Sequence, residues 1–273
     1  MIRLGHIVYS NCFPVHALLL ERPPHGIAVV TGVPSELNER LAAGDIDVAP
    51  CSSIEYARHA AEYRVLPDLA IASAGPVQSI LLESTVPAEG LGGCDVLVPT
   101  ASATSVVLLR ILLELRLGVV PRLHWYDQAD GNDPLAAGAP AALRIGDVAL
   151  LRRPEGSRLV YDLGEEWTRW TGLPFAYALW QARAGLPAGE LARLHTLLLE
   201  SRAWFFARVE RLARTNAESF GLQPARLATY WRSLRYSLDP ETLAGLMHFF
   251  RLAHEIGAAP AIGTVRWSDR AAR

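Results

Sequence analysis

Hydroxyl-bearing side chains gather at two points of the chain where an apolar segment gives way to a helical one. Residues 44–56 read GDIDVAPCSSIEY, in which Ser52 and Ser53 follow a short strand-like run, and residues 95–105 read DVLVPTASATS. The first turn of a helix carries unpaired N–H groups and a partial positive charge, so hydroxyls at such a junction predict an anion site. Simple helix capping is the alternative, and it is the favoured one for Ser52 and Ser53. The second junction is the stronger signal, because its four hydroxyl residues exceed what one cap needs: Thr100, Ser102, Thr104 and Ser105.

Three further polar residues follow apolar segments. Asn11 comes after the strand-like run Ile2 to Val8, at the carboxyl end where open α/β sheets bind ligands, although an Asn there is often only a turn residue. Asp147 interrupts the apolar run Ala142 to Leu151 and either caps a turn or faces a cleft. Ser79 follows Gly75-Pro76, a break expected to bend the chain between two lobes, and is either part of the cleft wall or an ordinary small inward residue.

Composition excludes several classes of protein. The chain has 273 residues, is 51% hydrophobic and 20% charged, and carries a net charge of −2. It has no apolar run of the roughly 18 residues that a membrane span needs and no evident secretory signal, so we expect a cytoplasmic protein without a membrane partner. No basic patch with interleaved aromatics is present, and nucleic acid is therefore not expected as a partner.

The basic residues narrow the chemistry further, since all 26 are Arg and none is Lys. A Schiff-base lysine and a P-loop lysine are therefore impossible, and the glycine-rich dinucleotide, serine hydrolase and zinc protease motifs are missing as well. Cys12, Cys51 and Cys94 are odd in number and widely spaced, which supports neither a disulfide framework nor a metal knuckle. The chemistry must come from hydrogen bonds, carboxylates, Arg and His.

Strand-like and helical segments alternate up to about residue 180, and helices follow, which predicts a mixed α/β sheet system. Leu173 to Trp180 is expected to be a buried strand that carries the chain back to the first lobe, and Asp162 and Asp239 are expected to cap the helices that follow them. We expect three C-terminal helices, over residues 186–220, 224–236 and from Asp239 to Gly257, with core aromatics and with His195, His248 and His254 as packing or surface residues. The two anion-suited junctions come from separate regions, so a ligand held by both would lie between two lobes. We expect residues 1–83 and 178–273 to form the first lobe and residues 84–177 the second.

A set of short motifs, kept in a fixed order from the N-terminus to about Trp180, resembles the chorismate dehydratase family of the futalosine route to menaquinone. The matching motifs are GHIxYxNxxP (5–14), GDxDVAP (44–50), SxEY (53–56), GPVxS (75–79), TS (104–105), IGDxAL (145–150) and DLGxxW (162–167). The C-terminal helices resemble the family only in length and helical character.

The resemblance implies a cytoplasmic enzyme with a two-lobed, periplasmic-binding-protein-like (type II) fold and a helical C-terminal region. Such an enzyme converts chorismate to 3-[(1-carboxyvinyl)oxy]benzoate and water with no metal or organic cofactor, and the resemblance leaves a homodimer open. It implies that Asn11 and Ser79 contact the substrate as catalytic residues, and that Thr104 and Ser105 hold a carboxylate. The further substrate-binding candidates are Ser10, Ser52, Ser53, Gly75, Ser102 and Asp147.

The identity of the base divides the remaining hypotheses. The matched positions are mainly Asn, Ser and Thr, so we expect the substrate's own enolpyruvyl carboxylate to act as base, with Glu55 and Asp147 as alternative protein bases. A solute-binding protein without chemistry is one rival reading. The sister enzyme acting on cyclic dehypoxanthine futalosine is another, for which only His124 is available as a base in the second lobe, and a structural or regulatory ligand-binding module is the third.

Overall fold

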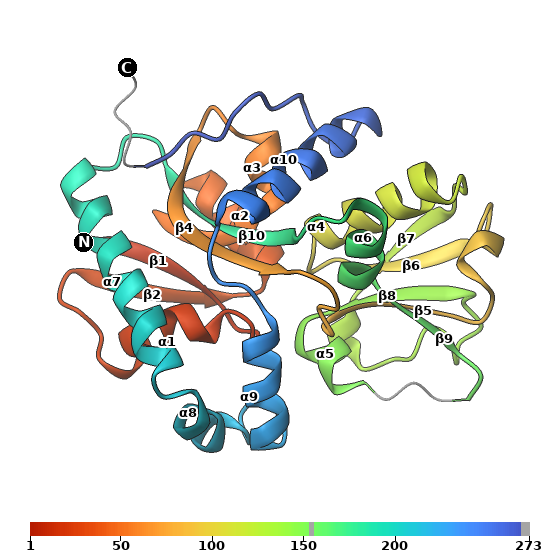
Figure 1. Cartoon of the computed structure of the whole chain (residues 1–273), viewed down its shortest axis with the longest axis horizontal. Helices are drawn as coiled ribbons and strands as arrows, with labels where there is room; N and C mark the ends of the chain where they lie inside the picture. Colours follow the sequence, from red (N-terminus) through yellow and green to blue (C-terminus); the bar gives the residue numbers. More distant parts are fainter. Residues whose placement is uncertain (153–155, 269–273) are drawn as a thin grey trace.

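The computed structural model describes residues 1–152 and 156–268, and its strands form two separate five-stranded sheets (Figure 1). The strands are β1 (Ile2–Ile7), β2 (Ile27–Gly32), β3 (Val48–Ser52), β4 (Tyr63–Ser73), β5 (Ile80–Ser84), β6 (Asp95–Pro99), β7 (Arg122–Tyr126), β8 (Ala141–Ile145), β9 (Leu159–Asp162) and β10 (Phe175–Arg183). The first sheet has the order β2-β1-β3-β10-β4 and the second β7-β6-β8-β5-β9. Both are mixed, because β10 is antiparallel to β3 and β4, and β5 is antiparallel to β8 and β9.

Helices cover both sheets. They are α1 (Phe13–Glu21), α2 (Pro34–Ala43), α3 (Ser53–Arg58), α4 (Thr104–Ile111), α5 (Gly146–Leu151), α6 (Leu163–Thr171), α7 (Ala188–Phe206), α8 (Val209–Asn216), α9 (Pro224–Ser233) and α10 (Pro240–Glu255). Short 3₁₀ turns cover Ala88–Gly90 and Gln128–Asp130, and a π-helical turn, Leu112–Arg116, extends α4. In the first half α7 packs along α1, and α10 packs on β10. Within the described ranges, no helix has the length and apolar character to cross a membrane.

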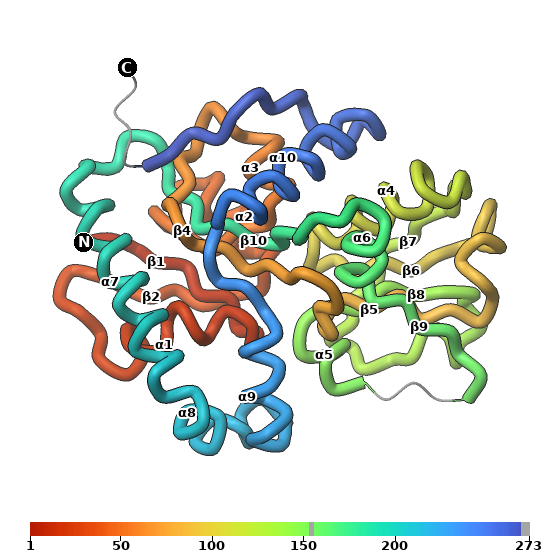
Figure 2. The backbone as a smooth tube through the Cα atoms, in the orientation of Figure 1, coloured from red at the N-terminus to blue at the C-terminus, as the bar shows by residue number. Residues whose placement is uncertain are grey.

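The chain passes between the two halves twice, as the tube in Figure 2 shows. It leaves the first sheet after β4 to enter β5, and it returns from α6 into β10, which lies between β3 and β4. The prediction of a buried strand that carries the chain back from Leu173 is confirmed by β10. The predicted lobe boundaries, 83/84 and 177/178, fall inside strands β5 and β10. Because β5 belongs to the second sheet and β10 to the first, the chain passes between the sheets a few residues before each predicted boundary. The division into two moving lobes stays a prediction.

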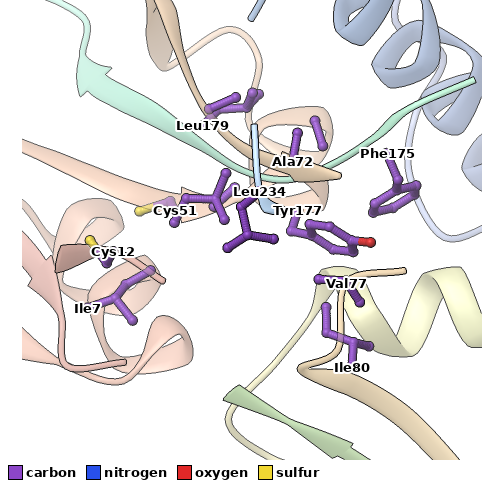
Figure 3. Close-up of a cluster of buried hydrophobic side chains, with 14 of the residues drawn as sticks. Ile7, Cys12, Cys51, Ala72, Val77, Ile80, Phe175, Tyr177, Leu179 and Leu234 are labelled. Carbon is purple, nitrogen blue, oxygen red and sulfur yellow. The ribbon is translucent and has the colours of Figure 1, made fainter. Parts of the chain in front are cut away.

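One continuous hydrophobic core runs through both halves. Figure 3 shows Ile7 and Cys12 on one side of this cluster, Tyr177, Val77 and Ile80 on the other, and Leu234 between them. The halves also meet where Tyr9 lies against Gly146, which has φ +61°. A Cβ at this glycine would lie 2.8 Å from the Tyr9 ring, so the close approach requires glycine here.

The local helix signals were partly right. Asp162 and Asp239 cap α6 and α10 as predicted, by accepting hydrogen bonds from first-turn N–H groups. The prediction of one helix over residues 186–220 is wrong, because α7 ends at Phe206 and α8 begins at Val209. Apolar periodicity continues across this break, since buried residues of both helices face the same core, and periodicity alone therefore does not reveal it.

Candidate functional site

A cavity that is partly open to solvent lies between the two halves. The residues that line it come from β1 and the turn after it, the start of α2, the β3–α3 and β6–α4 junctions, β4, the start of β5, the β8–α5 junction and β10. They are Ile7, Tyr9, Asn11, Pro34, Ser52, Ile71, Ile80, Ser102, Thr104, Ser105, Ile145, Gly146, Tyr177 and Ala178. Five of the residues singled out from the sequence are therefore brought to one cavity: Asn11, Ser52, Ser102, Thr104 and Ser105.

The hydroxyls at the β6–α4 junction form a local network at the start of α4. Ser102 Oγ donates to Ser105 Oγ at 2.9 Å and accepts from the Ser105 N–H at 3.3 Å. Thr104 Oγ1 accepts from the N–H of Ile54 in α3 at 3.2 Å, so this hydroxyl also joins the two halves. The first N–H groups of α4 and these hydroxyls present donors to a negative group, with the helix dipole in the favourable direction.

The two serines at the β3–α3 junction have different surroundings. Ser52 lines the cavity, and its N–H donates to Asn38 Oδ1 at 3.2 Å. The Ser53 hydroxyl instead donates to the Ala176 carbonyl of β10 at 2.7 Å and lies outside the lining. Neither side chain caps α3, so the capping interpretation is wrong. The Ser53 hydroxyl is hydrogen bonded instead to strand β10, which follows more than 100 residues later in the chain.

Asn11 lies in the turn between β1 and α1 and lines the cavity. Its Oδ1 is buried without a hydrogen-bond partner among the described residues, an arrangement that costs about 1–3 kcal/mol unless a ligand supplies a donor. Ser79 is buried behind the lining, where its hydroxyl accepts a 2.8 Å hydrogen bond from the Tyr230 hydroxyl of α9. The structure thus brings Ser79 near the site through α9 and not as a wall residue.

Asp147 and Ser10 form a contact between the halves. The Ser10 N–H donates to Asp147 Oδ2 at 3.0 Å, and the Ser10 hydroxyl donates to Oδ1. Burial raises the pKa of Asp147, and the Ser10 hydrogen bonds oppose that rise. Neither residue is among those that line the cavity. The carboxylate therefore holds the β1–α1 turn against α5.

Gly75 has a structural role in the first passage between the sheets. Its φ is +108°, a conformation that suits glycine, and its N–H donates to Thr168 Oγ1 at 2.9 Å. Asp162 holds the same passage by accepting from the N–H groups of Val77 at 2.9 Å and Gln78 at 2.6 Å. Gly75 does not line the cavity.

The protein groups proposed as bases lie elsewhere. Glu55 is buried, which raises the pKa of its carboxyl; it accepts from the Tyr63 hydroxyl at 3.4 Å and lies 3.6 Å from His59. His124 is about half exposed and pairs with Asp95 at 3.0 Å. Among the described residues that line the cavity, none is an acid, a histidine or an arginine.

A second polar cluster, which the sequence did not reveal, joins His6, Cys12 and His16 within 4.8 Å. Trp180 Nε1 donates to His16 Nε2 at 2.9 Å, so a neutral His16 carries its proton on Nδ1 and donates it to His6 Nδ1, also at 2.9 Å. A metal on His16 Nδ1 would move that proton to Nε2, where it would face the Trp180 N–H. Burial lowers the pKa of His6 to about 4 and raises that of the Cys12 thiol to about 12, so Cys12 is not a thiolate. The donor set therefore fits a hydrogen-bond chain and does not fit a metal ion.

Several site residues were missed from the sequence. Tyr9 and Tyr177 line the cavity, and Tyr230 contacts Ser79, whereas the sequence offered Tyr177 only as part of a buried strand and Tyr230 as part of a helix. The apolar walls come from isolated isoleucines, namely Ile7, Ile71, Ile80 and Ile145. An apolar residue in an apolar segment is expected in the hydrophobic core, and this expectation is correct for most residues of the segments that contain these isoleucines.

Comparison with known proteins gives a consistent family. A family profile described as menaquinone biosynthesis matches residues 2–255. The chain is 33% identical to a chorismate dehydratase of Thermus thermophilus, over 90% of this chain and 93% of that protein. It is also 33% identical to a chorismate dehydratase of Campylobacter jejuni, over 64% of each chain.

Solved structures show the same fold at lower sequence identity. A protein from Archaeoglobus fulgidus matches with a TM-score of 0.77 and 19% identity, covering 94% of this chain and 97% of that one. The periplasmic aliphatic sulphonate binding protein of Escherichia coli matches with a TM-score of 0.67 and 18% identity, covering 95% and 88%. The periplasmic-binding-protein-like fold predicted from the sequence is thus confirmed.

Proposed function

We propose, because the chain belongs to the menaquinone biosynthesis family, that it is an enzyme that removes water from chorismate to give 3-[(1-carboxyvinyl)oxy]benzoate. The relatives at 33% identity carry the name of this activity, and the likeness extends over nine-tenths of the chain in one of them. The lyase class, the small-molecule substrate and the site residues are parts of the same proposal.

The observation that carries the proposal is the chemistry of the cavity lining. Its polar side chains are hydroxyls and one carboxamide from both halves, and the described lining includes no acid, histidine or arginine. Such a site binds anions through O–H and N–H donors and supplies no strong base of its own. It suits a substrate that carries its own carboxylate base.

The reaction then balances within the substrate and one water product. The enolpyruvyl carboxylate takes the ring proton next to the ether oxygen, and the C–H electron pair enters the ring. The neighbouring C–O bond breaks, the hydroxyl leaves with that proton as water, and the ring becomes aromatic. Positioning of reacting groups can supply about 7–11 kcal/mol of the barrier reduction, which is the contribution expected from a site of this kind.

Each group of cavity residues has its own role in positioning the substrate, set by where it lies in the site. Ser102, Thr104 and Ser105 at the start of α4 bind one substrate carboxylate, and Ser52 on the facing junction binds the other polar end. Asn11 orients the departing hydroxyl, which can donate to the unpaired Oδ1. The contacts Ser10–Asp147 and Ile54–Thr104 hold the halves together around the substrate and exclude water, while the passages before β5 and β10 serve as the hinge.

The test is direct. The purified protein is mixed with chorismate, and the aromatic product is followed by its absorbance and identified by chromatography and mass. Appearance of 3-[(1-carboxyvinyl)oxy]benzoate with one equivalent of product per chorismate supports the proposal. Chorismate binding by calorimetry without any aromatic product would contradict it and favour a solute-binding protein.

A further inference from the structure

Helix α9 places two buried aromatic residues against the loops of the proposed site. The Tyr230 hydroxyl donates to Ser79 Oγ at 2.8 Å, and Trp231 Nε1 donates to the Ser10 carbonyl at 2.7 Å. Both side chains are almost fully buried, with relative exposures of 1% and 0%. The C-terminal helical region is thus in direct contact with both parts of the chain that hold Asn11 and Ser79.

Ser79 adjoins the wall of the cavity. It precedes the lining residue Ile80, and its carbonyl accepts from the N–H of Gly146, a second lining residue, at 2.8 Å. Burial raises the pKa of Tyr230, which keeps the phenol protonated at neutral pH, so the phenol proton is always available to Ser79.

The direction of each hydrogen bond follows from its neighbour. Ser79 accepts from Tyr230 and must use its own proton elsewhere, and the carbonyl of Val77 lies 3.4 Å away, at the long end of hydrogen bonding. The Tyr230 hydroxyl therefore makes the shorter of the two hydrogen bonds that fix the Ser79 side chain.

We infer that Tyr230 is a positioning residue of the proposed dehydratase site, whose hydroxyl fixes Ser79 and with it the adjoining wall residues Ile80 and Gly146. The inference rests on the proposed function and adds a residue from the C-terminal helices to a site otherwise built from the first 180 residues. Tyr230 does not line the cavity, so it acts through Ser79 and not on the reacting atoms.

The test is Tyr230→Phe, which removes one hydroxyl and keeps the packed ring. We expect kcat for chorismate to fall about 10- to 100-fold, because misoriented groups lose catalysis steeply, while KM changes little. Tyr236→Phe is the matched control, since Tyr236 is equally buried and its hydroxyl has no partner among the described residues. We expect Tyr236→Phe to retain the parent kcat.

A double-mutant cycle with Ser79→Ala separates positioning from a general structural effect. Because Tyr230 acts through Ser79, the Tyr230→Phe loss in kcat should shrink in the Ser79→Ala background; equal losses in both backgrounds would overturn the inference. Parent-like kcat in Tyr230→Phe overturns the inference while leaving the proposed function intact, whereas a parent protein that does not convert chorismate overturns the proposed function itself. Failure of Tyr230→Phe to fold also counts against the inference, because one neutral hydrogen bond contributes too little to abolish folding.

Discussion

Two buried polar clusters adjoin the single connection between β1 and α1, and they differ in whether their hydrogen bonds are complete. In the histidine cluster, Trp180 Nε1 donates to His16 Nε2, and His16 Nδ1 donates to His6 Nδ1. Both ring nitrogens of the central His16 therefore have a partner. The second cluster, called the open cluster below, is Asn11 with the Tyr230–Ser79 pair: the Asn11 Oδ1 has no partner among the described residues, and the Ser79 hydroxyl donates only at 3.4 Å. A closed network stabilises the fold, whereas an open one beside a cavity is free to bind. Residue types alone would have ranked the two clusters the other way, since histidine and cysteine are the more common catalytic side chains.

The largest effect expected from this comparison is on turnover in Asn11→Asp. A carboxylate at this position cannot donate a hydrogen bond and puts a negative charge next to a substrate with two carboxylates. We expect kcat/KM for chorismate to fall about 100- to 1,000-fold with the thermal melting temperature nearly unchanged. Asn132→Asp, the same change on an exposed loop, is the control and should match the parent. Parent-like turnover in Asn11→Asp would remove the open cluster from the mechanism.

The histidine cluster predicts a pH-dependent stability. The pKa of His6 in the folded protein is about 4, below the ordinary value of 6.5, so the unfolded chain takes up the proton first as pH falls. The stabilising contribution is complete above pH 6.5 and is lost between pH 6.5 and about 4. This loss amounts to about 3 kcal/mol for His6, and His16, whose pKa is also lowered, adds to it.

Urea unfolding at a series of pH values measures this dependence. The free energy of unfolding should fall on acidification in the parent and fall less steeply in His6→Asn. The exposed His25→Asn should keep the parent's slope. A parent whose stability does not change between pH 6.5 and 4.5 would show that the cluster is not buried in its neutral form in solution.

The third prediction concerns a substitution that disrupts the histidine cluster and leaves the open cluster around Asn11 unchanged. His16→Leu leaves the Trp180 N–H without its partner and His6 Nδ1 with only the Cys12 Sγ contact at 3.6 Å, and we expect a loss of about 2–3 kcal/mol in the free energy of unfolding. Turnover of the folded protein should stay at the parent level, because the cluster does not line the cavity. A variant that is as stable as the parent but inactive would reverse the assignment of the two clusters.

The smallest expected effect concerns Asp147, which is paired although it adjoins the open cluster. Asp147→Asn keeps one acceptor oxygen for Ser10 and loses the other, which weakens the contact between the halves by about 1 kcal/mol and raises KM roughly fivefold. Asp130→Asn on the surface serves as the matched control. If Asp147→Asn instead abolished kcat, Asp147 would have to be reinstated as a candidate base.

Local sequence patterns predicted many of the residues that line the site, but they did not predict the long-range contacts that hold these residues in place. The strand ends, the hydroxyl-rich turn at Thr100 to Ser105 and the caps Asp162 and Asp239 depend on neighbours within a few residues, and these were legible. The loss of the Ser53 hydroxyl to Ala176, the Ser10–Asp147 contact and the approach of Tyr230 to Ser79 each join segments more than 100 residues apart. Such contacts depend on how the two sheets and α9 pack, and no local period or spacing encodes them.

The place of β10 in the first sheet has a consequence for how this protein is made. Strands β3 and β4 are hydrogen bonded to β10 and not to each other, so they have no shared partner until residues 175–183 leave the ribosome. During synthesis of the whole second half, the edges of these two apolar strands stay unpaired and exposed to solvent or to chaperones, a condition associated with slow folding and aggregation. A nascent chain that pauses before Phe175 is therefore the form of this protein most exposed to misassembly.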